Sequence, residues 1–369
     1  MSDATDLPEP DRAPGAPHPR ETLRLFGQAR AEAGFLEAFG TGRLHHGWLL
    51  TGPRGIGKAT LAWRIARFLL TAPEPGGLFA PPPPVSLDVP QDHPVRRRTL
   101  ALSEPRLFLL RRGANDRGNA LSADIRVDEA RRLKGFLQLS ATDGGRRVVI
   151  VDAADDLNPA AANALLKLLE EPPAGACFLM VAHQPARLLP TIRSRCRELR
   201  LATLGPQDMA QALAQTGSEA PDPAALAALS GGSVGEALRL VTLDGLALYA
   251  RLVALLSAMP RFDRAEALAL AESVAGKGNE ARFELLAGLL DLLLARLART
   301  GVAGPPGAEA APGEAATLAR LAPDAGAARH WAGLQQELGA RARRGRAVNL
   351  DPAALVMDMV LQITAAASA

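Results

Sequence analysis

The sequence predicts an α/β protein in which a parallel sheet flanked by helices is followed by helical domains. A short apolar run, Trp48 to Leu50, leads directly into a glycine-rich loop and then into a helical pattern. Further apolar runs alternate with helical patterns as far as Ala182, which is typical of a doubly wound parallel sheet. Apolar residues make up 48% of the chain and aromatic residues only 4%, a composition that favours packed helices over an all-β fold.

The length of 369 residues exceeds what one hydrophobic core usually supports, so two or three domains are expected. Residues 1–20 are polar and proline-rich and predict a disordered lead. Residues 21–202 hold the alternating pattern and predict the core domain, which includes a proline-rich insertion at 73–94. Residues 203–242 predict a small helical domain, and residues 243–369 predict a larger one.

Charge and hydropathy limit the partners only loosely. A net charge of +3 and a pI of about 9.2 permit an acidic partner such as nucleic acid without demanding one. Arginine clusters of this kind are usually solvated faces, although they can also contact phosphates. They occur at 96–98, 111–112, 146–147 and 341–346. No apolar leader and no run of 18 apolar residues is present, so a cytoplasmic protein without a membrane partner is expected.

The loop after Leu50 reads Gly-Pro-Arg-Gly-Ile-Gly-Lys from position 52 to 58. It matches the first seven places of the phosphate-binding motif GxxxxGK[ST], and it lies between a strand and a helix as that motif requires. Glycines allow backbone N–H groups to close around a phosphate, and the lysine supplies positive charge. The phosphate contacts are therefore expected from Gly52, Gly55, Gly57 and Lys58.

The eighth place of the motif lacks its hydroxyl. In the motif a serine or threonine there ligates Mg²⁺, but this chain has Ala59. Thr60 comes one place later, and adjacent residues on a helix point about 100° apart. Thr60 is thus a candidate nucleotide-binding residue, but it is not expected to replace the missing ligand.

The elements around the loop follow from local patterns. A helix is expected between Glu21 and Gly40, and the helix after the loop carries an apolar face. Prolines from 73 to 94 predict a surface loop, and regular structure is expected to resume near Ile125. A helix is predicted from Val127 to Leu139.

The second half of the core repeats the strand–helix pattern. A β-branched run at 148–151 ends in Asp152 and predicts a buried parallel strand with a carboxylate at its C-terminal edge. Asn158 and Pro159 predict the N-cap and first turn of a helix, which must end before Pro172. The next strand is predicted at 177–182.

The remainder of the chain is expected to be helical. Two short helices are separated by Gly231-Gly232, and from about Leu243 the helical pattern is continuous. A Gly/Pro/Ala stretch at 301–313 interrupts it, and a last amphipathic helix is expected from Asp351 to about Ile363. One helical face is defined by Phe283, Leu286, Leu290, Leu293 and Leu297.

Asp152 lies where a Walker B aspartate holds Mg²⁺, and hydrolysing proteins of this class place a glutamate next to it to polarise the attacking water. The next residue here is Ala153. Asp155 is the nearest substitute, but at three residues' distance it is expected to face a different direction. A second catalytic element therefore lacks its working group.

Arg195 lies in the run Thr-Ile-Arg-Ser-Arg-Cys at 191–196, which follows the last predicted strand. An arginine exposed at such a turn can enter a neighbouring subunit's nucleotide site and stabilise charge on the transferring phosphoryl group. It can equally be a surface arginine or part of an intrachain salt bridge. The sequence pattern leaves both interpretations open.

As a set, these motifs resemble the bacterial clamp-loader AAA+ family, in particular its delta-prime branch. The resemblance depends on the loop at 52–58, Val-Val-Ile-Val-Asp-Ala-Ala-Asp at 148–155, Asn-Ala-Leu-Leu-Lys-Leu-Leu-Glu-Glu-Pro-Pro at 163–173 and Ser-Arg-Cys at 194–196. It covers residues 20–240, and the rest is similar in helical character. It implies an AAA+ P-loop core at 21–202, a helical lid at 203–242 and an all-α collar for oligomerisation at 243–369.

The resemblance also implies a function. Such a subunit joins gamma/tau and delta subunits in a pentameric ring of the DNA polymerase III holoenzyme, which uses ATP to load a sliding clamp onto primer-template DNA. Arg195 would then act in trans on a neighbouring subunit. Hydrolysing members carry a hydroxyl residue after the loop lysine, Asp-Glu in Walker B and an arginine in a Gly-Ser-x-Arg element of the lid. Because these places hold Ala59, Ala153 and Gly235, we expect a subunit without polymerase activity or ATP turnover of its own.

No metal is predicted. The chain has two cysteines, Cys177 and Cys196, with no CxxC spacing, and it lacks the four-cysteine zinc module that many family members carry between the Walker motifs. The loop can hold ATP or ADP without turnover, or it can be empty and only shape a turn. The sequence leaves both states open.

Two other functions are compatible with parts of the sequence. An ATP-hydrolysing AAA+ motor, either gamma/tau-like or another DNA-remodelling ATPase, needs Thr60 and Asp155 to supply the missing groups. A small-molecule P-loop kinase does not account for Ser194-Arg195-Cys196 or for the helical C-terminal third.

Overall fold

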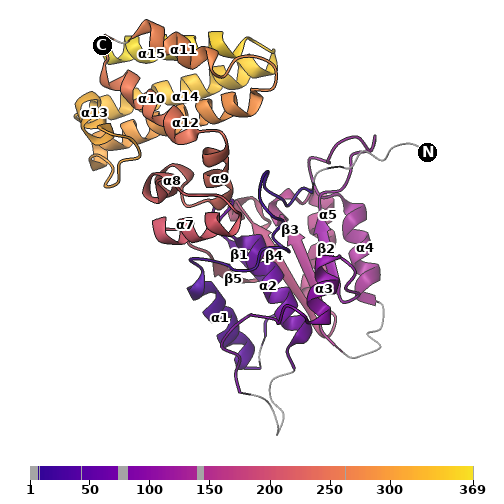
Figure 1. The fold of residues 1–369 in the computed structure, drawn as a ribbon. Helices are drawn as coiled ribbons and strands as arrows, with labels where there is room; N and C mark the ends of the chain where they lie inside the picture. Colours follow the sequence, from indigo (N-terminus) through magenta and orange to yellow (C-terminus); the bar gives the residue numbers. More distant parts are fainter. Residues whose placement is uncertain are drawn as a thin grey trace. The chain divides into compact units, whose positions relative to one another are not determined.

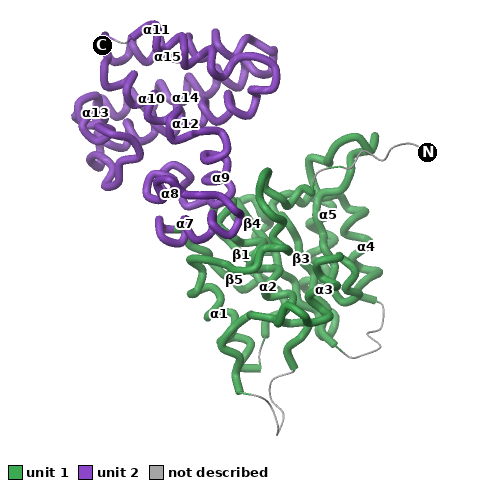
Figure 2. Tube along the Cα trace, in the orientation of Figure 1, with its two compact units in different colours: residues 1–204 green, residues 205–369 purple. Residues whose placement is uncertain are grey.

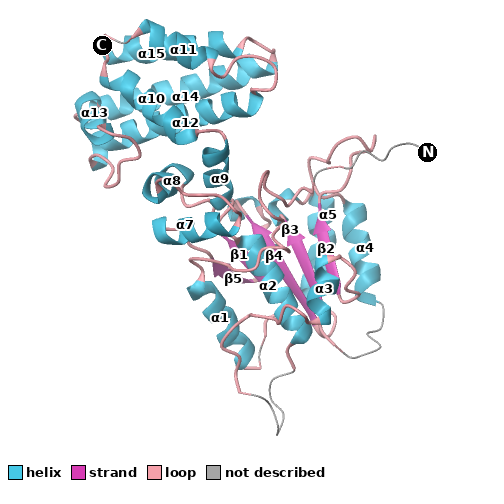
Figure 3. Cartoon of the chain, viewed as in Figure 1, coloured by secondary structure: helices cyan, strands magenta, loops and turns pink. Residues whose placement is uncertain are grey.

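The computed structural model describes residues 7, 9–42, 44–73, 82–138, 145–261 and 263–368. Two compact units, residues 1–204 and 205–369, make up the chain (Figure 2). The first unit contains a sheet with helices on it, and the described part of the second contains helices only (Figure 3). The finer division of residues 203–369 into lid and collar stays a prediction.

A five-stranded sheet forms the centre of the first unit, with strand order β2-β3-β4-β1-β5 (Figure 1). All neighbouring strands are parallel, so the predicted parallel sheet is confirmed. The strands are β1 (Gly47–Thr51), β2 (Leu107–Arg111), β3 (Arg147–Asp152), β4 (Ala176–Ala182) and β5 (Arg197–Arg200). The helices of this unit are α1 (Ala29–Gly40), α2 (Lys58–Thr71), α3 (Pro94–Leu100), α4 (Val127–Gln138), α5 (Pro159–Glu170) and α6 (Pro190–Arg193).

Both faces of the sheet are covered, which explains why β3 and β4 read as uninterrupted apolar runs. Helix α2 packs against β1, β3 and β4 on one face. On the other face, side chains from α4 and α5 form one cluster with alternate strand residues such as Leu49, Val149 and Phe178. The predicted helix over 127–139 ends at Gln138, and Leu139 lies outside the described residues.

The N-terminal third departs from the sequence-based expectations. The helix expected from Glu21 begins only at Ala29, because the amide of Gln28 is held by Ile56 O at 3.2 Å and Ala202 O at 2.7 Å. Regular structure returns well before Ile125, in α3 and β2, and both were missed. Strand β2 lies at the sheet edge and is only half-buried, so its pattern is weak. Within the proline-rich insertion, residues 74–81 lie outside the described residues.

The expectation of a disordered lead is wrong for residues 9–20. The His18 side chain is fully buried and lies edge-on to the Trp63 ring of α2, with 6.1 Å between centroids. Arg20 forms an ion pair with Glu9 at 2.5 Å. These contacts hold the lead against the core, whereas residues 1–6 and 8 lie outside the described residues.

The second unit is built from α-helices, and its predicted helical character is confirmed for the described residues. Helices α12 and α14 form the most extensive pair, and α15 packs against α11 and α14. The predicted apolar face at 283–297 is buried in α12. The helices are α7 (Pro206–Gln215), α8 (Pro223–Ser230), α9 (Val234–Thr242), α10 (Gly245–Ser257), α11 (Arg264–Glu272), α12 (Glu280–Ala303), α13 (Glu314–Leu321), α14 (Ala325–Ala347) and α15 (Pro352–Ser368).

A buried polar cluster closes the break between α12 and α13. The Glu314 carboxylate accepts a hydrogen bond from the Tyr249 hydroxyl at 2.6 Å and pairs with Arg296 Nε at 2.6 Å. Its other oxygen accepts from the N–H of Ala310 at 2.7 Å. The Gly/Pro/Ala stretch is therefore tied to two helices by one carboxylate. The last helix runs to Ser368, five residues beyond its predicted end at Ile363.

In the part of the chain that the structure describes, no single helix is long and apolar enough to cross a membrane. The pair α8 and α9 reaches that length and composition only when taken together, and it bends by 116° at the break.

Candidate functional site

The phosphate loop joins the end of β1 to the first residue of α2, at the C-terminal edge of the sheet. Gly52, Gly55 and Gly57 have φ angles of 134°, 79° and 97°, a range that side chains other than glycine rarely adopt. A Cβ atom on Gly57 would also collide with Leu25 Cδ1. The loop conformation therefore requires the glycines that the motif predicts.

Lys58 is folded back onto its own loop. Its side chain is 3% exposed, and Nζ donates to Gly52 O at 2.7 Å and also to Pro53 O. Burial lowers the pKa of Lys58 to about 8, although the charges of Asp152 and Asp155 act in the opposite direction. The ammonium thus donates its hydrogen bonds to carbonyl oxygens of the loop itself.

Asp152 ends β3 and stands opposite Arg111 of β2 in the sheet register. Its side chain is 7% exposed, and no described group donates a hydrogen bond to Oδ2. Burial raises the pKa of Asp152 to about 7, and the nearby charge of Asp11 raises it further. Near neutral pH this carboxyl is consequently divided between its protonated and ionised forms.

The N-terminal lead contributes charge to this edge of the sheet. Asp11 Oδ1 lies 2.5 Å from Arg111 Nη1, and Oδ2 lies 3.1 Å from His18 Nε2. Burial alone would raise the pKa of Asp11, but His18 and Arg111 outweigh it and lower the pKa. The sequence gives no signal for this contact, because Asp11 sits in a polar, proline-rich stretch.

Asp155 and His183 link the ends of β3 and β4. The backbone N–H of His183 donates to Asp155 Oδ1 at 2.9 Å, so the carboxylate is turned toward β4. Burial lowers the pKa of His183, and the charge of Lys58 lowers it further. Sequence reasoning missed His183, although it directly follows a buried strand, the same position that singled out Asp152.

The donor set does not fit a bound Mg²⁺. Ala59, in the first turn of α2, and Ala153, buried after β3, place methyl groups at the two motif positions that should supply a hydroxyl and a carboxylate. Thr60 is buried in α2 at the following position. Within the described ranges, no three His, Cys, Asp or Glu side chains are grouped so that they could hold a metal. What is present at the motif positions is a set of loop amides, Lys58 and the Asp152 carboxyl, with Asp11 and Asp155 nearby.

Arg195 lies at the opposite edge of the sheet. It comes two residues before β5 begins, and its backbone oxygen lies beside Gly47, the first residue of β1. The phosphate loop follows the last residue of the same strand. Five strand residues span about 13 Å, so the sheet separates Arg195 from the loop of its own chain.

The Arg195 side chain is 36% exposed, and its guanidinium contacts acceptors on Glu170, Thr191 and, at 3.5 Å, Ser194 Oγ. Nη2 lies 2.8 Å from Glu170 Oε1 at the end of α5, and Nη1 donates to Thr191 O at 3.0 Å. The intrachain salt bridge that the sequence left open is therefore present. Exposed pairs of this kind are weak, at about 0–1 kcal/mol, so the guanidinium remains available to a stronger acceptor.

Several of the arginine clusters are engaged within the chain. Arg98 pairs with Glu104 at 2.8 Å, and Arg341 pairs with Asp358 at 2.9 Å. Arg346 also contacts Glu284. These contacts fit the interpretation of solvated, internally paired faces.

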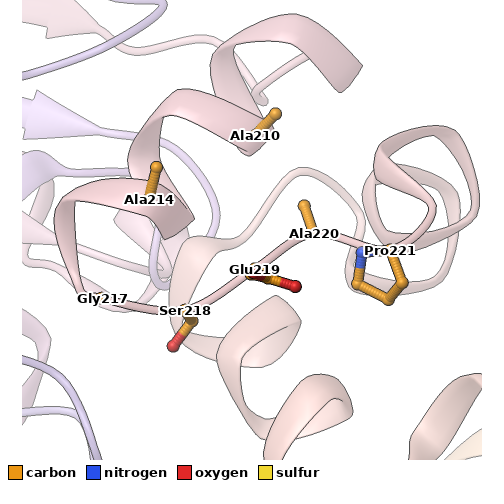
Figure 4. Close-up of a pocket in the computed structure, with 7 residues that line it drawn as sticks. All are labelled: Ala210, Ala214, Gly217, Ser218, Glu219, Ala220 and Pro221. Carbon is orange, nitrogen blue, oxygen red and sulfur yellow. The ribbon is translucent and has the colours of Figure 1, made fainter.

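Two features belong to the second unit. Gly235 lies in the first turn of α9, where the Ser233 hydroxyl caps the helix by accepting from the N–H of Glu236 at 3.2 Å. A hollow of about 540 Å³ lies beside α7 (Figure 4). Its lining has one charged side chain, Glu219, and offers no set of converging polar groups for a nucleotide. The lining residues are Ala210, Ala214, Gly217, Ser218, Glu219, Ala220 and Pro221.

Comparison with known proteins shows similarity to subunits of DNA polymerase III. Residues 88–205, which include Asp152, Glu170 and Arg195, match the family model for the DNA polymerase III delta subunit. The DNA polymerase III subunit delta′ of Pseudomonas aeruginosa is 39% identical over 201 residues, covering 53% of this chain and 55% of that protein. Over about half of its length the chain is similar to DNA polymerase III clamp-loader subunits. This confirms the resemblance read from the motifs.

Other DNA polymerase III subunits are also similar to about half of the chain. Subunit delta′ of Escherichia coli is 36% identical over 213 residues, covering 55% of this chain and 56% of that protein. Subunit gamma/tau of Mycobacterium tuberculosis is 30% identical over 207 residues, covering 53% of this chain and 31% of that protein. The chain thus spans about half the length of the delta′ relatives it matches, and less of the gamma/tau proteins.

Solved structures resemble the chain more distantly. A gamma subunit-related protein of Thermotoga maritima covers 90% of the chain and 99% of its own length at 17% identity, with a TM-score of 0.36. The RuvB Holliday junction branch migration motor of the same organism covers 75% and 76% at 17% identity, with a TM-score of 0.37.

Proposed function

We propose that this chain is a non-hydrolysing, delta-prime-type subunit of the clamp loader, and that it supplies Arg195 to the nucleotide site of a neighbouring subunit. Its partners in this proposal are gamma/tau and delta subunits in a pentameric ring. Through that ring it helps to place a sliding clamp on primer-template DNA. Similarity to delta′ proteins over about half of the chain, and the family-model match over residues 88–205, which include Asp152 and Arg195, support this assignment.

Three observations support the absence of turnover by this chain. Ala59 and Ala153 provide no ligand for Mg²⁺ and no base for water. Asp152 is buried, and its raised pKa leaves it partly protonated at neutral pH. Lys58 already donates to carbonyl oxygens of the loop, so a nucleotide must displace it before the loop can bind phosphate. Weak binding of ATP or ADP without hydrolysis is part of the proposal.

The position of Arg195 carries the trans role. Because it lies at the edge of the sheet opposite its own phosphate loop, the nucleotide it can reach must belong to another subunit. Its fork also has N–H groups left over after the bonds to Glu170 and Thr191. An arginine of this type stabilises charge on the transferring phosphoryl group.

An ATP-hydrolysing motor accounts for the geometry less well. Similarity to gamma/tau proteins over about half the chain is the observation in its favour. However, Thr60 is buried in α2, and one oxygen of Asp155 is committed to the N–H of His183. Neither residue stands where the missing hydroxyl or glutamate would have to be.

The test uses the full chain reconstituted with gamma/tau and delta subunits, sliding clamp and primed DNA. Arg195→Ala should lower ATP turnover at the adjoining site by about 10³-fold or more, so that the ring loses that site's share of its total rate. Arg193→Ala removes an exposed positive charge from the same segment and should leave the rate unchanged. Equal rates for wild type and Arg195→Ala would contradict the trans role.

A further inference from the structure

We propose that Glu170 is a positioning residue for the Arg195 finger. Its carboxylate holds the guanidinium in the orientation from which it enters the neighbouring nucleotide site. This inference rests on the proposed trans role of Arg195 and adds a second residue to it. The two side chains meet at 2.8 Å, between Glu170 Oε1 and Arg195 Nη2.

Glu170 is presented by a rigid element. It is the last residue of α5, whose start is capped by the Asn158 side chain, which accepts from the N–H of Ala161 at 2.8 Å. Leu165 and Leu169 of the same helix are buried in the core beneath the sheet. The backbone that carries the Glu170 carboxylate is therefore held in place, as a positioning group requires.

Arg195, in contrast, belongs to a short connection between α6 and β5. Its backbone is fixed on one side by the buried Ile192 and on the other by Leu199 of β5. The long arginine side chain has many rotamers, and each bond to a fixed acceptor reduces them. The Glu170 oxygen and the Thr191 carbonyl each hold one terminal nitrogen.

The remaining donors stay available for catalysis. A guanidinium has five N–H groups. Nη1 donates to Thr191 O and Ser194 Oγ, and Nη2 forms the ion pair with Glu170. The N–H of Nε and one N–H of Nη2 are left for phosphoryl oxygens. Since the Arg195 side chain is 36% exposed and that of Glu170 is 41% exposed, the pair holds the arginine without burying it.

The oxygen acceptor of Glu170, more than its charge, is what positions Arg195. Glutamate also reduces the positive charge that the finger presents to phosphate, so removing the charge alone should not harm the reaction. Glu170→Gln keeps an oxygen acceptor at nearly the same place. Glu170→Ala removes the acceptor altogether and frees the rotamers.

The experiment measures ATP turnover of the reconstituted complex with full-length variants of this chain. Glu170→Ala should lower kcat at the adjoining site about tenfold with KM unchanged, because a misplaced finger affects the transition state more than nucleotide binding. Glu170→Gln should restore kcat to at least the wild-type value. Glu171→Ala, which alters the neighbouring exposed carboxylate, is the matched control and should be silent.

A double-variant cycle separates this inference from the proposed function. In the Arg195→Ala background, Glu170→Ala should produce no further loss, because Glu170 acts through Arg195. If Arg195→Ala lowers kcat and Glu170→Ala does not, the positioning role is wrong and the trans finger stands. If Glu170→Ala lowers kcat equally in both backgrounds, or Gln fails to restore it, the positioning role is also wrong. If Arg195→Ala itself has no effect, the proposed function fails first.

Discussion

Lys58 Nζ donates a hydrogen bond to Gly52 O at 2.7 Å, so the lysine that ends the phosphate loop binds the residue that starts it. A second bond to Pro53 O completes this closure. Burial has lowered the pKa of Lys58 to about 8, which reduces the positive charge available to a phosphate at alkaline pH. The chain has therefore kept the shape of a nucleotide loop while its lysine is engaged in holding that shape.

The first prediction concerns Asp152 and pH. Its folded pKa of about 7 lies above the ordinary value of 3.8. Between these values the folded state keeps a proton that the unfolded state releases, so stability from this group is present at low pH and is lost as pH rises toward 7. Asp152→Asn mimics the protonated form, so it should stabilise the first unit at pH 8 by on the order of 1–4 kcal/mol and by clearly less at pH 5.

Denaturant unfolding followed by tryptophan fluorescence measures this difference, because Trp48 and Trp63 lie in the first unit. Asp92→Asn, at an exposed carboxylate, is the control and should leave the free energy of unfolding unchanged at both pH values. If Asp152→Asn stabilised the protein equally at pH 5 and pH 8, the pKa of Asp152 would not be raised in the folded state.

The second prediction concerns the lead at residues 9–20. His18→Ala leaves a cavity beside Trp63 and removes a partner of Asp11. It should destabilise the first unit by about 2–4 kcal/mol. Urea unfolding checks this, with Arg12→Ala as the control because Arg12 lies in the same segment but is exposed. If His18→Ala lowered the free energy of unfolding no more than Arg12→Ala does, residues 9–20 would not be held against the core.

The third prediction separates steric collision from backbone strain in the phosphate loop. Gly57→Ala meets both a positive φ and the Leu25 side chain. Gly118→Ala meets a positive φ of 69° with no atom within 4 Å of the added Cβ. Alanine at a positive φ costs about 1 kcal/mol or more, and both variants lose this amount. The collision with Leu25 should make Gly57→Ala more destabilising than Gly118→Ala by at least about a further 1 kcal/mol. Equal losses in thermal or urea unfolding would show that Leu25 does not close on the loop.

The helices and strands that the sequence predicted correctly are those whose position depends on neighbouring residues in the chain. Strands β3 and β4 are buried on both faces, so their apolar runs were unmistakable. The caps and prolines around α5 also identified that helix correctly. By contrast, the start of α1 depends on bonds from Gln28 to Ala202, which is 174 residues away. No local pattern reports such a contact.

The residues of the site could be predicted from the sequence more fully than the contacts between them. The glycines, Lys58 and Asp152 were identified by motif, and the structure brings Lys58 and Asp152 close enough for their charges to interact. Asp11 was missed because its order depends on Arg111, which lies 100 residues further along the chain. The pairing of Arg195 with Glu170 likewise joins two motifs that only the fold brings together.

The most direct test of the central claim is ATP turnover by the purified chain alone in the presence of Mg²⁺. The missing groups at Ala59 and Ala153 and the engaged Lys58 predict no hydrolysis above background, and no difference between wild type and Lys58→Ala. Turnover by the isolated wild-type chain that disappears in Lys58→Ala would contradict the claim, because the loop would then be a working ATPase site.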